Sequence, residues 1–589
     1  MKFKVAVRLI TLIICSVLWC NYTYSQQDTV FWFAAPDVDA SHGDSPIWIR
    51  VSTLAQPASI ILSVPANKSF AEQPLNIPPN STGSINLSAF KIMVENQPSN
   101  TVNNFGLLLT SSTPVTAYYE VASTVNPDIW PLKGKNGLGF EFYIPSQNSY
   151  PNQIGYESFE IVATEDNTVV NITVTDDVVG HAAGSTFQVN LNQGQTFSVV
   201  SLSQAASHTL AGSHITANKP IAISIKDDSI RPNPTGGYDV VGDQLQSLSI
   251  LGLEYVVVKG FAYQGSTNYE RAYIMAVQNN TQIFLDGAAF PVTTLNAGQT
   301  YVLTVDNGAY YVLGDKPIYV YHISGHQTEL GSAILPHITC TGSEQIGFNR
   351  TANGAFSLII LTKDANKSGF IVNGNSTIIQ PSDFTVVPGT SGMWAYARKD
   401  LTSTGLIPLG PNVITNSIGA FHLGILNELG GSSEYGYFSD YSSLYLGPDI
   451  KYCKGNTATL DAGAGKDTYL WSNGVANQTI IVNDTGTYWV TVTEGLCTLS
   501  DTIHLAYFSD FTVNLGDDTA VCQGNQATFS PGAGYKSYHW HNGSTQPTFT
   551  SGTAGQIWVQ VTDENNCPGA DTLMFSIHPL PTPVFIKHF

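Results

Sequence analysis

Basic residues are scarce in this chain of 589 residues: 24 Lys and Arg stand against 44 Asp and Glu, and the formal net charge is −20 at pH 7. Binding to nucleic acid needs a basic stripe that neutralises phosphates, so no nucleic-acid partner is expected. Charged residues of both signs make up only 12% of the chain, which is about half of the usual share. The surface must therefore be built largely from Ser, Thr, Asn, Gln and Gly, as in many secreted β-proteins.

Long hydrophobic runs are missing too. Beyond the N-terminus, no segment reaches the ~18 consecutive apolar residues of a membrane-spanning helix. The N-terminus has the pattern of an export signal, with basic residues before a short apolar core at 9–18 and cleavage expected before Gln26. Because that core is too short for a retained anchor, we predict a signal peptide at residues 1–25. The mature protein is then extracellular or on the cell surface, without membrane insertion.

Helix-forming patterns are few. Runs of Ala, Leu, Glu and Lys with a 3.6-residue period are rare, whereas the chain contains 52 Gly, 30 Pro and 28 Tyr. A chain of this length is expected to form several domains. The sequence therefore predicts an all-β, multi-domain protein.

The C-terminal end contains a tandem repeat of about 70 residues. "CKGNTATLDAGAGKDTYLWSNG" (453–474) aligns with "CQGNQATFSPGAGYKSYHWHNG" (522–543). Short alternating strands between Gly, Asn and Asp turns predict two small β-sandwich modules, residues 446–510 and 511–580, with a truncated linker at 581–589. The repeated pattern resembles the Ig-like and PKD-like modules of large secreted surface proteins of gliding bacteria.

Only seven cysteines are present, and five remain once the signal peptide is removed. Four of the five lie in the tandem modules, which predicts two disulfides and one unpaired thiol in an oxidising compartment. We expect Cys453–Cys497 and Cys522–Cys567, each tying a module's first strand to its last hairpin. The fifth, Cys340, is interpreted as a structural or unpaired thiol rather than a nucleophile.

Two features of the modules make specific predictions. "DTGTYWV" (484–490) resembles the tyrosine corner of immunoglobulin-like domains, in which the Tyr488 hydroxyl would bond to the preceding backbone. His539 and His541 alternate on a strand, a spacing that zinc and copper sites use. Because their counterparts in the first module are Leu470 and Ser472, we favour two positions flanking a buried Trp over a metal site.

Residues 26–445 also repeat, as three or four β-sandwich-like units. "LNQGQTFSV" (191–199) is similar to "LNAGQTYVL" (295–303), and "ANKPIAISI" (217–225) to "GDKPIYVYH" (314–322). Successive side chains in the last segment are apolar on both faces, which predicts an inner strand.

Several motifs in this region occur in the order expected of one family: "FWFAAPDVDASHGDSPIWIRVST" (31–53), "VVGDQLQSLSILGLEYVVV" (240–258) and "ILPHITCTGS" (334–343). They resemble the N-terminal domain of the IgGFc-binding protein family. The resemblance implies a non-catalytic, extracellular binding or adhesion domain. The resemblance does not imply that this chain binds Fc, because no Fc-contacting residues of the family can be mapped onto this sequence.

Two clusters are candidate metal sites. Asp37, Asp39 and Asp44 near His42 have oxygen ligands that suit Ca²⁺, but turn-forming Asp is common beside Gly and Ser, and we favour a capped turn.

His322, His326 and Glu329 lack the H-E-x-x-H helix of zinc enzymes. No cofactor is therefore expected.

Aromatic side chains are the remaining candidates for binding. Trp32, Trp48, Trp130 and Trp394 could stack on sugars or anchor a partner, although we expect most of them to fill cores. The sequence thus predicts a secreted or cell-surface, non-catalytic adhesion protein for an extracellular protein or glycan. The alternatives are a carbohydrate-active enzyme with a site in the N-terminal region and a structural spacer.

Overall fold

The computed structural model describes residues 28–582, apart from 233–236, 403, 440–443, 445, 447–448, 464–465 and 495–496. The predicted signal peptide and most of the predicted linker lie outside these residues. Nearly every described element is a β-strand, so the prediction of an all-β, multi-domain chain is confirmed. The helices in the described part are all too short or too polar to span a bilayer.

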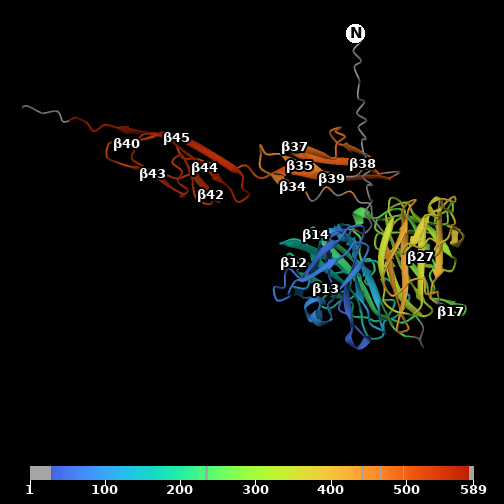
Figure 1. The fold of residues 1–589 in the computed structure, drawn as a ribbon. Coiled ribbons are helices and arrows are strands. Elements are labelled where there is room, and N and C mark those ends of the chain that lie inside the picture. Colours follow the sequence, from blue (N-terminus) through green and yellow to red (C-terminus); the bar gives the residue numbers. More distant parts are fainter. Residues whose placement is uncertain are drawn as a thin grey trace, which may run out of the picture. The chain divides into compact units, whose positions relative to one another are not determined.

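The chain forms two compact units, Met1–Ser443 and Leu444–Phe589 (Figure 1). The described part of the first unit is built from four successive β-rich repeats. The first two contain β1 Asp28–Phe33, β2 Ile47–Thr53, β3 Ala58–Ser63, β4 Gln73–Ile77, β5 Thr82–Asn86, β6 Val102–Asn103, β7 Leu107–Val121 and β8 Asp128–Pro131, then β9 Leu138–Tyr143, β10 Glu157–Ala163, β11 Thr168–Thr173, β12 Thr186–Leu191, β13 Thr196–Val200, β14 His214–Ile230 and β15 Asp239–Gln244.

Whereas the first and the second repeat are each built around one connected sheet, the third and fourth repeats each form two separate main sheets. They contain β16 Glu254–Val258, β17 Tyr263–Gln264, β18 Thr267–Asn268, β19 Arg271–Ala276, β20 Thr281–Leu285, β21 Thr293–Leu295, β22 Thr300–Thr304, β23 Ala309–Gly314, β24 Ile318–His326 and β25 Glu329–Ile334, then β26 Gln345–Arg350, β27 Phe356–Lys363, β28 Phe370–Val372, β29 Phe384–Val386, β30 Trp394–Asp400, β31 Gly410–Asn416, β32 Phe421–Leu429 and β33 Ser432–Phe438. The short helices are η1 Ala40–His42, η2 Ser88–Phe90, α1 Lys91–Val94, η3 Gly134–Gly137, η4 Leu248–Ile250, η5 Asp364–Asn366 and η6 Pro381–Asp383.

Each repeat ends in an antiparallel hairpin, namely β7–β8, β14–β15, β24–β25 and β32–β33. The second strands of these hairpins, which we call the return strands, contact one another in cyclic order: β8 with β15, β15 with β25, β25 with β33, and β33 with β8. The four repeats therefore close into a ring with the return strands at its centre.

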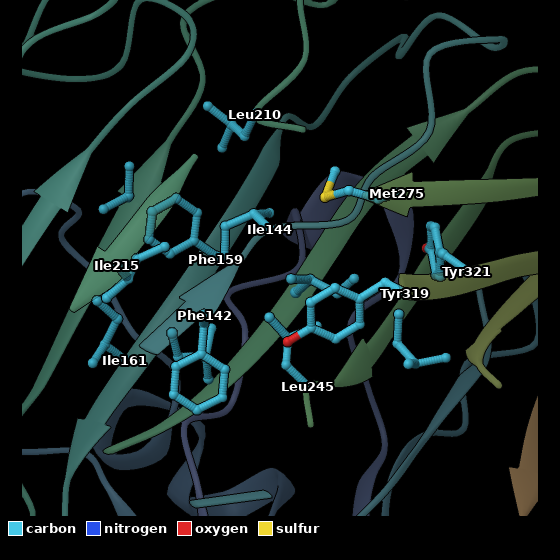
Figure 2. Packing of buried hydrophobic residues seen from close by; sticks show 14 of the residues in the cluster. Phe142, Ile144, Phe159, Ile161, Leu210, Ile215, Leu245, Met275, Tyr319 and Tyr321 are labelled. Carbon is cyan, nitrogen blue, oxygen red and sulfur yellow. The ribbon is translucent and has the colours of Figure 1, made fainter. Parts of the chain in front are cut away.

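Hydrophobic cores are shared between neighbouring repeats. Met275 and Tyr319 of the third repeat pack with side chains of the second, as Figure 2 shows. Trp394 of the fourth repeat packs with the third, and Tyr118 and Ile129 of the first pack with the fourth. A single repeat would thus expose apolar surface that its neighbours cover.

Strand β24 illustrates why a strand can be apolar on both faces. It lies between β19 and β25. Its residues Ile318 and Val320 belong to the core shared with the fourth repeat, while Tyr319, Tyr321 and Ile323 belong to the core shared with the second. The prediction of an inner strand is confirmed.

The second unit contains two β-sandwiches of the same topology. In the first, β34 Ile450–Tyr452, β39 Cys497–Tyr507, β38 Gly486–Glu494 and β36 Thr468–Trp471 form one sheet, and β35 Ala458–Asp461 and β37 Thr479–Val482 form the other. The second repeats this order with β40 Thr519–Cys522, β45 Pro568–His578, β44 Gly555–Thr562 and β42 Ser537–Trp540, opposite β41 Ala527–Phe529 and β43 Phe549–Ser551.

The core of each module is centred on one tryptophan. Trp471 and Trp540 are buried, and their indole nitrogens donate to Asn477 O and Gln546 O, both at 2.8 Å. The tyrosine corner is also confirmed, because the Tyr488 hydroxyl donates to Asp484 O at 3.1 Å.

The predicted disulfide pairing is wrong. Cys453 bonds to Cys567 of the other module, and Cys522 is a free, exposed thiol. Cys340, expected to be a structural or unpaired thiol, is disulfide-bonded. The side chain of Cys497 lies outside the described part, so its role stays a prediction.

Strand direction explains the error. The first strand of each module runs parallel to the last, so Tyr452 pairs with Tyr507, at the far end of β39 from Cys497. Cys453 and Cys497 are thus separated by a strand length of roughly 30 Å, whereas a disulfide needs Cα atoms within about 7 Å. In the second module, Cys522 pairs in register with His578, at the opposite end of β45 from Cys567.

Candidate binding surfaces

The acidic loop near the N-terminus is a capped turn, as favoured from the sequence. The Asp39 carboxylate accepts from Ser41 N at 2.9 Å and caps η1, which Gly43 closes at a φ of 87°. Lys91 pairs with the Asp44 carboxylate, and Lys226 donates to the backbone carbonyl oxygen of Asp37.

His42 and Asp228 complete this cluster. His42 Nδ1 lies 3.0 Å from Asp228 Oδ1, and Lys226 Nζ lies 3.6 Å from Asp228 Oδ2. Burial opposes ionisation of Asp228, but Lys226 and the His42 hydrogen bond outweigh it and lower its pKa. The negative charge is therefore balanced by the protein's own cations. Across the described residues, no group of three or more His, Cys, Asp or Glu is arranged to hold a metal ion.

The three side chains of the second candidate metal site, His322, His326 and Glu329, have separate partners. His322 Nε2 lies 3.4 Å from Glu270 Oε2, and His322 Nδ1 lies 3.2 Å from the Tyr435 hydroxyl. His326 lies between Ser433 Oγ and Ser357 Oγ, at 3.2 and 3.1 Å, and burial lowers its pKa. These histidines join the third repeat to the fourth.

Glu329, the third member, is part of a return strand. Burial raises its pKa. Burial and the neighbouring charge of Glu329 raise the pKa of Asp239 in β15 well above its usual range. The two carboxyls are therefore a contact between repeats rather than metal ligands.

Buried acids link the return strands, and the sequence did not single them out. Asp128 accepts from Tyr435 N at 3.0 Å and from Gly242 N at 3.1 Å, which connects the first repeat to the fourth and the second. Asp243 accepts from Ile334 N and from Lys133 Nζ, both at 2.7 Å. The only pattern in the local sequence that could have indicated these acids is an acidic residue near a Gly, which occurs in three of the return strands.

Two further buried acids lie near each other in the first and fourth repeats. Arg50 Nε donates to Glu120 Oε2 at 2.5 Å within the first repeat, and Asn427 Nδ2 donates to Glu434 Oε1 at 2.6 Å within the fourth. Burial, followed by the charge of Glu120, raises the pKa of Glu434 to about 8. The hydrogen bonds of Glu120 and Glu434 thus stay within their own repeats, while the charge of Glu120 acts on Glu434 across the two repeats.

The four tryptophans proposed from the sequence mostly fill cores, as expected. Trp32, Trp130 and Trp394 are buried. Trp48 is half-buried, with the Arg50 guanidinium 4.5 Å from its ring centroid.

The exposed apolar side chains lie elsewhere, and one group sits on and beside two touching loops. Phe290 is 82% exposed in the β20–β21 connection, and Met393 is 63% exposed just before β30. Val292 and Val386 beside them are also exposed. The loops touch, since a Cβ on Gly389 would lie 2.2 Å from the carbonyl carbon of Asp286. We call Phe290, Val292, Val386 and Met393 the apolar tip.

A second surface feature, a tryptophan on the outward face of a sheet, occurs in both C-terminal modules and is exposed in the first and half-buried in the second. Trp489 of β38 is 41% exposed, and Trp558 occupies the equivalent position of β44. The ring centroids of His539 and His541 lie 5.8 and 6.3 Å from that of Trp558. The two histidines therefore flank the buried Trp540 in sequence and lie close to the half-buried Trp558 in space. We call Trp489 and Trp558, with their neighbours on the same sheet face, the tryptophan platforms.

Residues 131–423 match the family model described as IgGFc binding protein. This segment includes β15, the acid contacts of Asp243 and the apolar tip. No curated protein matches the chain.

Solved structures of immunoglobulin domains resemble the chain at low identity. The N-terminal eight Ig domains of Down Syndrome Cell Adhesion Molecule isoform 1.30.30 are 11% identical, with 94% of this chain and 74% of that chain covered and a TM-score of 0.17. Extracellular domains 3–5 of Drosophila OTK are 9% identical, with 40% and 92% covered and a TM-score of 0.16. At these TM-scores, the likeness supports no conclusion about this chain.

Proposed function

We propose that this chain is a non-catalytic, extracellular or cell-surface adhesion protein. Residues 26–445 form a binding head of the IgGFc-binding family, and the two following modules are Ig-like or PKD-like domains of the kind found in bacterial surface proteins. The observation that carries the proposal is the family match over residues 131–423. An extracellular protein or glycan is the ligand class, and export by residues 1–25 belongs to the same proposal.

The polar groups of the head support binding rather than chemistry. Some of the most buried acids and histidines of the described part bond to a neighbouring repeat, as Asp128 and His322 do. Others, such as Glu160 and Asp227, accept hydrogen bonds from side chains of their own repeat. Groups buried and bonded in these ways are shielded from a substrate.

The apolar tip is our candidate for protein recognition. It lies within the matched segment and presents Phe and Met, residue types that are enriched at protein interfaces. Exposed aromatic and Met side chains on neighbouring loops are suited to anchoring a partner.

The test uses the chain without residues 1–25, immobilised and probed with IgG Fc, mucins and other extracellular proteins. We expect saturable binding of at least one protein. The variant Phe290→Ser/Met393→Ser should lose that binding by at least about tenfold.

The matched control is Ile92→Ser/Leu202→Ser, which removes two equally exposed apolar side chains outside the tip. It should bind like the wild type. Equal loss in both variants, or no binding by the wild type, would contradict the proposal. Release of reducing ends from a polysaccharide, abolished by one carboxylate substitution, would instead indicate a carbohydrate-active enzyme.

A further inference from the structure

We infer that the tryptophan platforms bind an uncharged polysaccharide. This site lies in the second unit, on other residues than the apolar tip, and its ligand is a sugar polymer. The inference therefore goes beyond the function proposed for the head.

The same geometry occurs twice. In the first module, Trp489 pairs across β38–β39 with Thr502, and Ser472 N donates to Trp489 O at 2.7 Å. In the second module, Trp558 pairs with Thr572, and His541 N donates to Trp558 O at 3.1 Å. Each platform is thus a Trp held by a sheet, with a Thr on one side.

Core packing does not explain the platform tryptophans. Each module already has a buried Trp at its centre, and the platform Trp lies on the opposite face of the same sheet. Neighbours differ between the copies, since Leu470 stands where the second module has His539. The Trp and the adjacent Thr are nevertheless the same in both.

The faces around the platforms are largely polar and carry little charge: Lys451 of the edge strand β34 pairs with Ala506 on the first face, and the remaining strands of that face present no charged side chain among those that the structure describes. The outward-facing positions of β36, β38 and β39 carry, among the described side chains, Thr468, Leu470, Thr487, Trp489, Thr491, Thr493, Ser500, Thr502, His504 and Ala506. Those of β42, β44 and β45 carry Ser537, His539, Gln556, Trp558, Gln560, Thr562, Pro568, Ala570, Thr572, Met574, Ser576 and His578. No Asp, Glu, Lys or Arg occurs among them, in a chain with 44 acids.

This chemistry favours a neutral sugar polymer. The apolar C–H face of a pyranose can lie on an indole ring, while hydroxyl and amide side chains around it bond to the sugar hydroxyls. Among the described side chains of these faces, Lys451 alone could pair with an anionic polymer, which would be repelled by the net charge of −20. Two platforms on one chain add avidity on a repetitive ligand.

The test is native gel electrophoresis of the chain without residues 1–25, in gels containing xyloglucan, laminarin or galactomannan, with alginate as the anionic comparison. At least one neutral polysaccharide should retard the wild type, and alginate should not. Trp489→Ala and Trp558→Ala should each weaken retardation by about tenfold, and the double variant should abolish it.

Ile481→Ala is the matched control, because Ile481 is an exposed apolar residue on the opposite sheet of the first module. It should migrate like the wild type. Circular dichroism of the double variant checks that the sandwiches remain folded. The inference is overturned if no neutral polysaccharide retards the wild type, if the double variant is retarded equally, or if alginate retards the chain as strongly. The variant Phe290→Ser/Met393→Ser leaves the tryptophan platforms intact. The protein-binding test of the apolar tip and the polysaccharide test of the platforms can therefore fail independently of each other.

Discussion

At the scale of single residues, some ionisable groups of the first unit form buried contacts that stabilise the association of neighbouring repeats. The Lys133–Asp243 pair is fully buried, with Nζ and Oδ1 2.7 Å apart, and joins the first repeat to the second. Burial lowers the pKa of Lys133, and the Asp243 carboxylate counteracts this effect. Such a pair depends on both partners, because either one alone would be an uncompensated charge inside the protein.

Replacing Lys133 by Met tests this dependence. Since Asp243 would be left buried and unpaired, we expect the free energy of unfolding of the first unit to fall by about 3–5 kcal/mol. Urea denaturation monitored by tryptophan fluorescence measures the change.

Lys219→Met is the control, because Lys219 forms an exposed pair with Glu165 at 3.7 Å. That substitution should cost less than about 1 kcal/mol. An equal loss of unfolding free energy in the two variants would show that the buried Lys133–Asp243 pair does not stabilise the contact between repeats.

At the scale of elements, the sequence predicted strands well and their partners poorly. Two local sequence signals were interpreted correctly: the apolar residues on both faces of β24, and the tryptophans that repeat in the two modules. The disulfides were not, because the position of Cys453 relative to Cys497 depends on β34 running parallel to β39, which the local pattern does not encode. The acids that accept backbone N–H groups of another repeat, such as Asp128, were missed for the same reason.

Non-reducing peptide mapping tests the corrected pairing. We expect one peptide pair that joins Cys453 to Cys567, and alkylation of Cys522 in the native protein, since this thiol is exposed. Recovery of a Cys522–Cys567 pair, or of Cys453–Cys497, would contradict the described topology. Cys453→Ser should add one alkylated thiol, Cys567, and no other.

At the scale of the whole molecule, the ring of repeats is expected to respond to pH. Burial, as the largest cause, raises the pKa of Glu95, Glu157 and Glu434 to about 8 and that of Glu160 to about 7. These groups bind protons more tightly in the folded state than in the unfolded state. Their contribution to stability is therefore complete below the unfolded pKa, near 4, and is lost as pH rises through 7 to 8.

The first unit should accordingly unfold at a higher temperature at pH 5 than at pH 8.5. Calorimetry of the intact chain at both values measures the shift. Glu434→Gln should reduce this pH dependence, because the amide cannot ionise. A first unit that becomes more stable as pH rises from 5 to 8.5 would contradict the assigned protonation.

The central claim is that the chain holds an extracellular ligand without transforming it. The most direct measurement is mass analysis of that ligand, protein or polysaccharide, after prolonged incubation with a small molar fraction of the chain. The account predicts binding that saturates at a fixed stoichiometry and a ligand recovered with unchanged mass. Cleavage or modification of many ligand molecules by each copy of the chain would contradict it.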